Sequence, residues 1–219
     1  IEYLATSQGD NRNPDCPSKN YEAIDITDKN QVLRVVRDFE PDFIIHTAAI
    51  TNVDYCELNE QECHEVNVIG TQNIFDSAKS TGAHFQMLST DFVFDGKNGD
   101  YKETDLPNPL SIYAASKVNG EQILINSDYK NWSIVRTIIV YGEGSNLSRS
   151  NIVLWARDAL KKGSPLNIID DQFRSPTWAD DLAWGCIQIC KLNCTGIYHL
   201  SGPETMSIYD LVLRVAKFY

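Results

Sequence analysis

Short, mostly apolar segments recur along this chain, and they lack the strict alternation of apolar and polar residues. They cover 43–49, 85–89, 132–140, 166–169 and 196–200. Between and after them lie stretches of helical length, at 60–80, 111–126, 151–162, 178–192 and 207–218. Strands that are apolar on both sides are buried on both faces, and alternation with helices is typical of parallel sheets. The sequence therefore predicts an α/β fold whose parallel sheet is covered by helices on both faces.

Bulk composition narrows the class of protein. The 219 residues are 42% hydrophobic, which is enough for one sizeable core or for a large domain with a small lobe. No apolar run approaches the roughly 20 residues that a membrane-spanning helix needs. The net charge is −11, and no basic stripe is present that could neutralise phosphates. We therefore expect a soluble cytoplasmic protein that binds neither nucleic acid nor membrane.

Six cysteines raise the question of a metal site. Cys186, Cys190 and Cys194 fall on every fourth residue and would lie along one helix face. A metal site would need further ligands, and the four histidines are scattered along the chain. We predict no metal, and packed, reduced thiols in the cytoplasm.

Three of the predicted strands end in chemically suggestive segments. The segments 47–49, 89–91 and 140–142 all lie where a strand ends. In open parallel sheets, ligands bind at the carboxyl ends of the strands. The sequence therefore predicts that a functional site lies at this edge of the sheet.

The sharpest chemical signal is the pair Tyr113 and Lys117. Residues four apart on a helix share a face, so the phenol and the ammonium would lie side by side. A free tyrosine has a pKa near ~10, and a nearby positive charge lowers it. We expect the pair to act as an acid/base in a carbonyl–alcohol interconversion. An isolated match of this kind is equally typical of an ordinary exposed helix pair.

The segment Ser89-Thr90-Asp91 strengthens the catalytic interpretation. It ends the strand one unit upstream of Tyr113, and a hydroxyl there could bind the substrate oxygen that Tyr113 protonates. The alternative is a common strand-end turn capped by hydroxyl and carboxylate side chains.

Several motifs in a fixed order now resemble a known family. They are Thr47-Ala48-Ala49, Asn67 with Gly70, Thr71 and Asn73, the 89–96 segment Ser-Thr-Asp-Phe-Val-Phe-Asp-Gly, Tyr113 with Lys117, Arg136-Thr137, and the 171–177 segment. This set resembles extended short-chain dehydrogenase/reductases, and within them the dTDP-4-dehydrorhamnose reductase group. The resemblance covers essentially the whole chain.

The resemblance implies a Rossmann-like, doubly wound sheet with a small C-terminal substrate-binding lobe. Residues 1–142 would form a truncated dinucleotide-binding domain that carries the catalytic Tyr and Lys. Residues 143–219 would form most of the substrate-binding lobe, interleaved with the core sheet. The implied activity is NAD(P)H-dependent reduction of a 4-keto group on a nucleotide-linked deoxysugar. The substrate is then a nucleotide sugar, and a homodimer is among the expected assemblies.

The resemblance also assigns catalytic and substrate-binding roles. Thr90 would tune the tyrosine and hold the substrate oxygen, Tyr113 would donate the proton to the C4 oxygen, and Lys117 would polarise Tyr113. Thr90 and Asp91 would contact the sugar.

Cofactor-binding roles follow in the same way. The pair Asp25-Ile26 would flank the adenine, and Ala48, Ala49 and Ile50 would lie under the cofactor. Asn67 matches an active-site asparagine, and Tyr113 and Lys117 would also contact the cofactor, with Lys117 on the nicotinamide ribose. The alternatives are a nearby helix cap for Asp25, close strand–helix packing for the two alanines, and a buried amide tie for Asn67.

Three features depart from the family pattern. The Gly-rich loop that approaches the pyrophosphate does not occur, so we expect roughly 30 further residues upstream, judged from a βαβ unit, and weak dinucleotide binding without them. Ile139 stands where the group usually has a substrate-binding tryptophan, which puts dTDP-4-dehydrorhamnose itself in doubt. Phe92 replaces the glutamate that sugar-nucleotide dehydratases use as a base, which argues against dehydration.

The sequence does not decide between NADP(H) and NAD(H), and it leaves two alternative functions open. The segment Thr6-Ser7 carries no acid for a ribose hydroxyl and Arg12 is close in sequence, which favours NADP(H) over NAD(H). A regulatory subunit that resembles the methionine adenosyltransferase β subunit is one alternative, because such subunits can retain the Tyr–Lys pair. An NAD-dependent sugar epimerase is the other.

Overall fold

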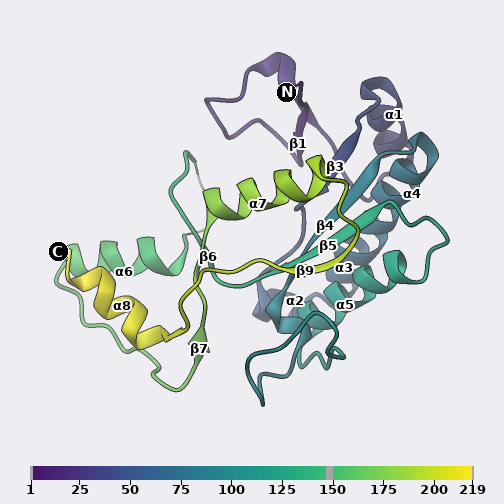
Figure 1. Ribbon diagram of the computed structural model, residues 1–219. Coiled ribbons are helices and arrows are strands. Elements are labelled where there is room, and N and C mark those ends of the chain that lie inside the picture. Colours follow the sequence, from purple (N-terminus) through teal and green to yellow (C-terminus); the bar gives the residue numbers. More distant parts are fainter. Residues whose placement is uncertain (1, 147–149, 219) are drawn as a thin grey trace. The chain divides into compact units, whose positions relative to one another are not determined.

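A computed structural model describes residues 2–146 and 150–218, and the chain divides into two compact units (Figure 1). The first unit consists of Ile1–Arg136 and Cys186–His199, and the second of Thr137–Gly185 and Leu200–Tyr219. The first unit is therefore discontinuous in sequence, because the segment Cys186–His199 joins it after most of the second unit.

A four-stranded sheet forms the centre of the first unit. Its strands are β3 (Phe43–His46), β4 (His84–Thr90), β5 (Trp132–Thr137) and β9 (Gly196–His199), in the order β3-β4-β5-β9. The pairs β3–β4 and β5–β9 are parallel. The strands β1 (Ala5–Ser7) and β2 (Tyr21–Ala23) form a separate parallel pair. The predicted α/β class with a parallel sheet is confirmed.

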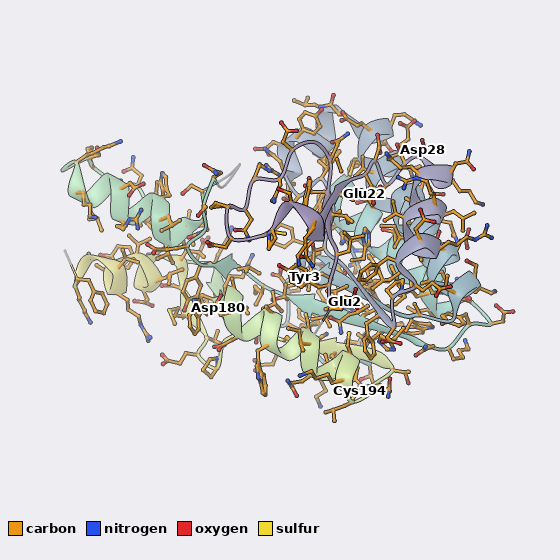
Figure 2. All side chains as sticks on the ribbon, turned by 90° about the horizontal axis from the view of Figure 1, so that it is seen from above. Glu2, Tyr3, Glu22, Asp28, Asp180 and Cys194 are labelled. Atoms are coloured by element: carbon orange, nitrogen blue, oxygen red, sulfur yellow. The ribbon has the colours of Figure 1, made fainter. Side chains whose placement is uncertain are left out.

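Local sequence signals fix the ends of the helices in this unit. The helix α1 (Lys29–Phe39) begins where the Asp28 carboxylate accepts hydrogen bonds from the backbone N–H groups of Asn30 and Gln31 (Figure 2). The helix α4 (Thr71–Thr81) ends at Gly82, whose φ of +80° is left-handed. The helix α5 (Ile112–Ile125) begins at Ser111, whose hydroxyl accepts from the Ala114 N–H at 3.2 Å.

The predicted single helix over 60–80 is wrong in its continuity. The structure has α3 (Glu60–His64), a π-helical turn η2 (Glu65–Gly70) and then α4, preceded by the short helix α2 (Val53–Leu58). The side chain of Asn67, within the π-helical turn, bonds to groups outside its own helix. Single π turns of this kind occur often at functional sites. Hydrophobic periodicity reports helical content and does not reveal such a local change of pitch.

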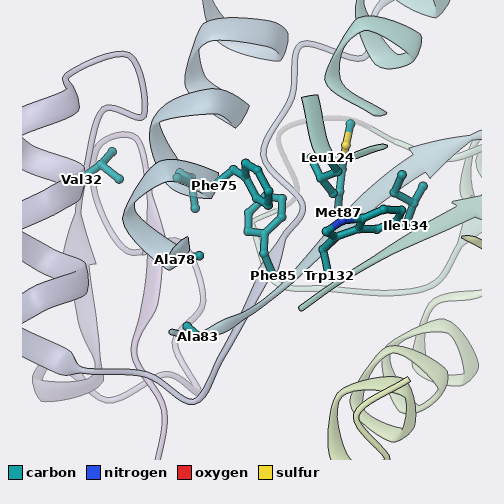
Figure 3. Packing of buried hydrophobic residues seen from close by; sticks show 10 residues of the cluster. Val32, Phe75, Ala78, Ala83, Phe85, Met87, Leu124, Trp132 and Ile134 are labelled. Carbon is teal, nitrogen blue, oxygen red and sulfur yellow. The ribbon is translucent and has the colours of Figure 1, made fainter. Parts of the chain in front are cut away.

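The core of the first unit joins the sheet to its helices. Ten buried residues form one apolar cluster (Figure 3): Val32, Ile74, Phe75, Ala78, Ala83, Phe85, Met87, Leu124, Trp132 and Ile134. The rings of Phe75 and Phe85 meet edge to face with centroids 5.4 Å apart. Complete burial of a side chain such as Phe85 contributes about 1.5–3 kcal/mol to folding. This cluster fixes the position of β4 relative to α4 and α5.

The second unit relies on short strands and helices. The strand β6 (Val140–Tyr141) pairs in parallel with β8 (Thr177–Trp178), and β7 (Phe173–Arg174) pairs antiparallel with β10 (Met206–Ser207). The helices are α6 (Ile152–Lys161) and α8 (Ile208–Ala216), and α7 (Ala179–Lys191) begins here and ends in the first unit. Its core consists of Ala156, Val212 and Val215 with four partly buried neighbours.

Three local predictions are corrected by the structure. Residues 166–169 form no strand, because Leu166 and Ile168 instead pack against the cluster of α6 and α8. The predicted strand 132–140 is interrupted, since Ile139 adopts a left-handed φ of +37° that a β-branched residue rarely takes. Cys194 lies beyond the last residue of α7, so only two of the three cysteines share that helix (Figure 2).

Candidate active site

Three predicted catalytic side chains come from β4 and α5 in the first unit. Thr90 is the last residue of β4, and Tyr113 and Lys117 lie one turn apart near the start of α5. All three are almost fully buried: 8% of Thr90, 8% of Tyr113 and 4% of Lys117 is exposed. The alternative of an ordinary exposed helix pair is therefore excluded.

Tyr113 lies in an apolar environment with one polar neighbour. Burial raises the pKa of Tyr113 to about 12, while its hydrogen bond with the Thr90 side chain acts in the opposite direction. The prediction that the neighbouring lysine brings this pKa below its usual value is wrong for this structure, because desolvation dominates. The phenol is consequently protonated at neutral pH, which is the state of a proton donor.

Lys117 is a buried ammonium with a carboxylate on the next helical turn. Burial lowers the pKa of Lys117 to about 8, and the charges of Glu121 and Cys63 act to raise it. The lysine is therefore close to the pH at which it would lose its charge, and its neighbours decide its state.

The two hydroxyls at the end of β4 have different partners. The Ser89 hydroxyl donates to Oε1 of Glu121 at 2.6 Å, so it turns away from the tyrosine. The Thr90 hydroxyl donates to Oδ1 of Asp91 at 3.1 Å, accepts from the Phe92 N–H at 3.2 Å and bonds to Tyr113. Within the Ser-Thr-Asp segment, Thr90 is therefore the residue whose hydroxyl is hydrogen-bonded to Tyr113.

Asn67 is a fully buried tie between three segments. Its Oδ1 accepts from the Ile50 N–H at 2.7 Å, and its Nδ2 donates to the Ile50 carbonyl and to the Ser116 Oγ, both at 2.9 Å. This geometry matches the alternative given for Asn67, a buried amide that ties its helix to neighbouring segments. Its effect is to hold the loop after β3 against α5, beside the tyrosine and lysine.

The predicted adenine-binding pair lies on a turn after β2. Asp25 accepts two hydrogen bonds from Thr27 at its Oδ1, and these bonds lower the pKa of Asp25. The helix cap is Asp28, so the alternative of a cap at Asp25 is excluded. Ile26 packs against Gly70, where a Cβ would lie 2.6 Å from the Ile26 Cδ1. A glycine is needed there for this close approach.

The loop after β3 presents small side chains. Ala48 is exposed, and Ala49 and Ile50 are half-buried. Because alanine side chains leave the backbone accessible, a flat ligand can lie close to this loop. Together with the turn carboxylate of Asp25 and the buried ammonium of Lys117, the loop offers small, acidic and basic groups whose chemistry suits a dinucleotide.

A buried ion pair close to the site was not predicted from the sequence. Glu121 is completely buried and accepts from Arg136 at two points, from Nε at 2.9 Å and from Nη2 at 2.6 Å. The signal that could have identified it is a glutamate four residues after Lys117 on a largely apolar helix. In the sequence, Arg136 is marked only by the family motif Arg136-Thr137.

The remaining predicted features belong to other segments of the chain. The motif of residues 171–177 and Ile139 belong to the second unit, and Arg12 is exposed in the segment after β1. Within residues 2–146 and 150–218, no group of three or more histidine, cysteine or acidic side chains is arranged to hold a metal ion. In the same residues, no helix is both long and apolar enough to cross a membrane.

Known proteins are similar to this sequence over most of its length. Residues 4–219 match the family model of the RmlD substrate binding domain. The dTDP-4-dehydrorhamnose reductase of Aggregatibacter actinomycetemcomitans is 35% identical over 97% of this chain and 73% of its own length. The methionine adenosyltransferase 2 subunit beta of Bos taurus is 30% identical over 91% of this chain. This chain spans only 61% of that subunit's length.

The similar solved structures include the same kind of enzyme as the similar sequences. The dTDP-4-dehydrorhamnose reductase of Bacillus anthracis, solved in complex with NADP, superposes with a TM-score of 0.87 at 28% identity, over 99% of this chain and 80% of the other. A UDP-glucose 4-epimerase of Thermus thermophilus, at 23% identity and a TM-score of 0.77 over 92% of this chain and 70% of the other, supports the fold alone. The Rossmann-like fold and the predicted family resemblance are confirmed, and the chain belongs to the RmlD substrate binding domain family.

Proposed function

We propose that this protein reduces a 4-keto group on a nucleotide-linked deoxysugar, with NADPH as reductant. The observation that carries the proposal is the buried arrangement of Thr90, Tyr113 and Lys117, which unites a protonated phenol, a hydroxyl and an ammonium. The relatives named as dTDP-4-dehydrorhamnose reductases supply the substrate class.

Each of the three side chains has a separate task in this proposal. Tyr113 donates its phenolic proton to the C4 oxygen of the sugar as that oxygen gains negative charge. Thr90, already bonded to Tyr113, orients the carbonyl oxygen toward the phenol. Lys117 stabilises the phenolate that remains, since a positive charge nearby favours the ionised form. Asp91, bonded to Thr90, contacts the sugar.

Other residues hold the cofactor. When bound, the nicotinamide cofactor supplies the hydride. The pair Asp25-Ile26 flanks the adenine, and the loop of Ala48, Ala49 and Ile50 lies under the dinucleotide. Asn67 contributes by fixing the position of Ile50, with which it shares two hydrogen bonds.

Lys117 and Tyr113 have a second role in this proposal, because the ammonium and the phenolic hydroxyl also bind the cofactor. Lys117 binds it at the nicotinamide ribose. Arg12 favours NADPH over NADH through a 2′-phosphate.

Two other functions have weaker support. A regulatory-subunit role is suggested by the methionine adenosyltransferase relatives, but these are 30% identical or less and this chain spans 61% of their length. The epimerase structure is under 25% identical, so it supports the fold and not an epimerase role. The reductase relative is both more similar and covered over a larger share of its length.

Location and assembly complete the proposal. We place the protein in the cytoplasm, where free thiols persist, because the cysteines of the described residues are unpaired. We also expect a homodimer, which analytical ultracentrifugation tests.

The direct test is turnover by the natural protein that carries this sequence. It is incubated with dTDP-4-dehydrorhamnose and NADPH, and the products are separated by chromatography. One NADPH consumed for each reduced sugar supports the proposal. Interconversion of sugars without net consumption of NADPH supports the epimerase. No turnover, together with specific binding to a methionine adenosyltransferase catalytic subunit, supports the regulatory role.

A further inference from the structure

Three polar side chains that have no task in the proposed reaction are buried together next to the candidate active site. They are Ser89 at the end of β4, Glu121 on α5 and Arg136 on β5, with exposed fractions of 4%, 0% and 3%. Burying charges is costly unless they are paired and hydrogen-bonded. Such a cluster therefore calls for an explanation beyond stability.

The carboxylate of Glu121 is the centre of this cluster. Its Oε1 accepts from Ser89 Oγ at 2.6 Å and from Arg136 Nε at 2.9 Å, and its Oε2 accepts from Arg136 Nη2 at 2.6 Å. The paired, planar geometry of the guanidinium limits where the carboxylate can lie. Glu121 consequently fixes α5 to both β4 and β5.

The cluster is adjacent to the catalytic groups along the chain. Ser89 directly precedes Thr90, and Glu121 follows Lys117 by one turn and Tyr113 by two, on the same face of α5. A shift of Glu121 would therefore move the hydroxyl, the phenol and the ammonium relative to one another. Misplacement of reacting groups by about 1 Å can cost about 100-fold in rate.

The other face of Arg136 is closed by aromatic rings. Its guanidinium carbon lies 5.1 Å from the centre of the Phe94 ring, and Phe94 stacks on Tyr101 with ring centres 4.3 Å apart. A guanidinium over a ring face is attracted to it. The arginine is thus held from both sides, which makes it a firm support for Glu121.

We propose that Glu121, supported by Arg136 and Ser89, is a positioning residue that aligns Thr90 with the Tyr113–Lys117 pair and keeps Lys117 in its ammonium form. This inference deepens the proposed reductase function and rests on it for the catalytic readouts. Charge and geometry act together here. The carboxylate lies one turn from the lysine on α5, and replacing it with a neutral group would leave the buried Arg136 without its carboxylate partner.

The charged and titratable neighbours of the lysine support this direction. Lys117 is faced by Glu121 on its own helix, by Cys63 of α3 and by His46 of β3. Glu121 and Cys63 raise the pKa of Lys117 against the effect of burial. His46 is buried with a pKa lowered to about 3, so it is neutral near pH 7 and adds no charge. Glu121, the carboxylate of the ion pair with Arg136, thus favours the ammonium form of Lys117.

The test compares three variants of the natural protein. E121Q keeps the size of the side chain and removes its charge, E121D keeps the charge and shortens the reach, and D128N removes one acid of the exposed Lys79–Asp128 pair. For E121Q we expect kcat to fall about 10- to 100-fold. KM for the nucleotide sugar should change little, and the alkaline limb of the kcat profile should move to lower pH by about one unit or more. E121D should restore the limb without restoring all of kcat, and D128N should match the natural protein.

A readout that needs no turnover separates this inference from the proposed function. The Lys117 side chain is titrated by NMR of carbon-13-labelled lysine, with its signal identified through K117R. A lower titration midpoint in E121Q and a restored one in E121D support the inference, even if the natural protein reduces no sugar and the reductase proposal fails. A folded E121Q whose Lys117 midpoint and alkaline limb both match the natural protein would overturn it.

Discussion

The two units of this chain bury very different side chains. Among the described residues, the buried lysine, glutamate and arginine (Lys117, Glu121, Arg136) all belong to the first unit. The second unit buries Thr137, Thr177 and Ser207, and its apolar cluster is small. Because buried polar groups lower stability unless they are satisfied, the first unit's large apolar core offsets the cost of a polar site. Among the described residues, the buried charges of these three side chains are thus confined to the unit that holds the proposed site.

The largest expected effect comes from removing the buried ammonium of the first unit. The substitution Lys117→Met should lower turnover about 100- to 10,000-fold, because the tyrosine loses its electrostatic partner. It should also raise the melting temperature near pH 7, since an apolar side chain replaces a buried charge. Steady-state kinetics and calorimetry on the same sample measure both changes. A variant that is both active and less stable would break the comparison between the units.

The lowered pKa of Lys117 also predicts how the stability of the protein changes with pH. The pKa of Lys117 is about 8 in the folded protein and near its ordinary value of 10.5 when unfolded. Between these values the unfolded chain binds the extra proton, so stability should rise with pH from about 8 to about 10.5. Lys117→Met should lack this rise.

A second comparison contrasts the two apolar cores. Phe85→Ala removes a fully buried ring from the first unit and should lower the free energy of unfolding by about 3–5 kcal/mol. Leu211→Ala in α8 should cost about 2–3 kcal/mol, because the second unit has fewer neighbours around its helices and can close a cavity more easily. Urea denaturation of both variants measures the difference. Equal losses would contradict the view that the first unit holds the dominant core.

A third comparison uses two glycines with different neighbours. A Cβ at Gly202 in the second unit would lie 2.0 Å from the Pro176 carbonyl oxygen, a backbone atom that cannot easily move. A Cβ at Gly120 in α5 would lie 2.7 Å from the Met87 Cε, the end of a flexible side chain. Gly202→Ala should therefore cost about 1–3 kcal/mol. Gly120→Ala should be nearly neutral, because the higher helix propensity of alanine offsets the shift of Met87. The reverse order in thermal melts would show that the backbone at Pro176 can shift to accept the added Cβ.

The last comparison concerns the acid stability of the first unit. His46 is buried with its Nε2 3.0 Å from the Thr71 Oγ1, and burial lowers its pKa to about 3. The unfolded chain binds a proton at a higher pH, so this histidine makes stability fall as the pH drops from about 6.5 toward 3. His46→Gln should therefore show a shallower loss of stability over that range in urea titrations. An unchanged slope would assign acid sensitivity to other groups.

The sequence predicted the parallel sheet, which the structure confirms, and it indicated the candidate pair Tyr113 and Lys117, because both features have local sequence signals. Apolar runs reveal strands such as 43–46, and the spacing of Tyr113 and Lys117 places both on one helix face. The direction of the Tyr113 pKa shift could not be predicted, since it depends on burial by residues distant in sequence. The π-helical turn at Asn67 and the pairing of Glu121 with Arg136 also arise from contacts between separate elements.

The short strands of the second unit were hard to predict for a related reason. Two-residue strands such as β6 and β8 are too short for any periodicity. The left-handed backbone at Ile139 opposes the local preference of isoleucine, and the Thr177 N–H bonds to its carbonyl at 3.0 Å. The bond comes from a segment almost forty positions away in the printed sequence, which no local pattern could supply.

The most direct test of the central claim is the rate of sugar reduction by Tyr113→Phe in the natural protein, measured in single turnovers with NADPH. The matched control is Tyr129→Phe, which removes a hydroxyl that donates to the Ala83 carbonyl at 2.8 Å in the same unit. We expect Tyr113→Phe to lose about 100- to 10,000-fold in rate while it still folds, and Tyr129→Phe to keep the natural rate. A folded Tyr113→Phe protein that reduces the sugar at the natural rate would contradict the account.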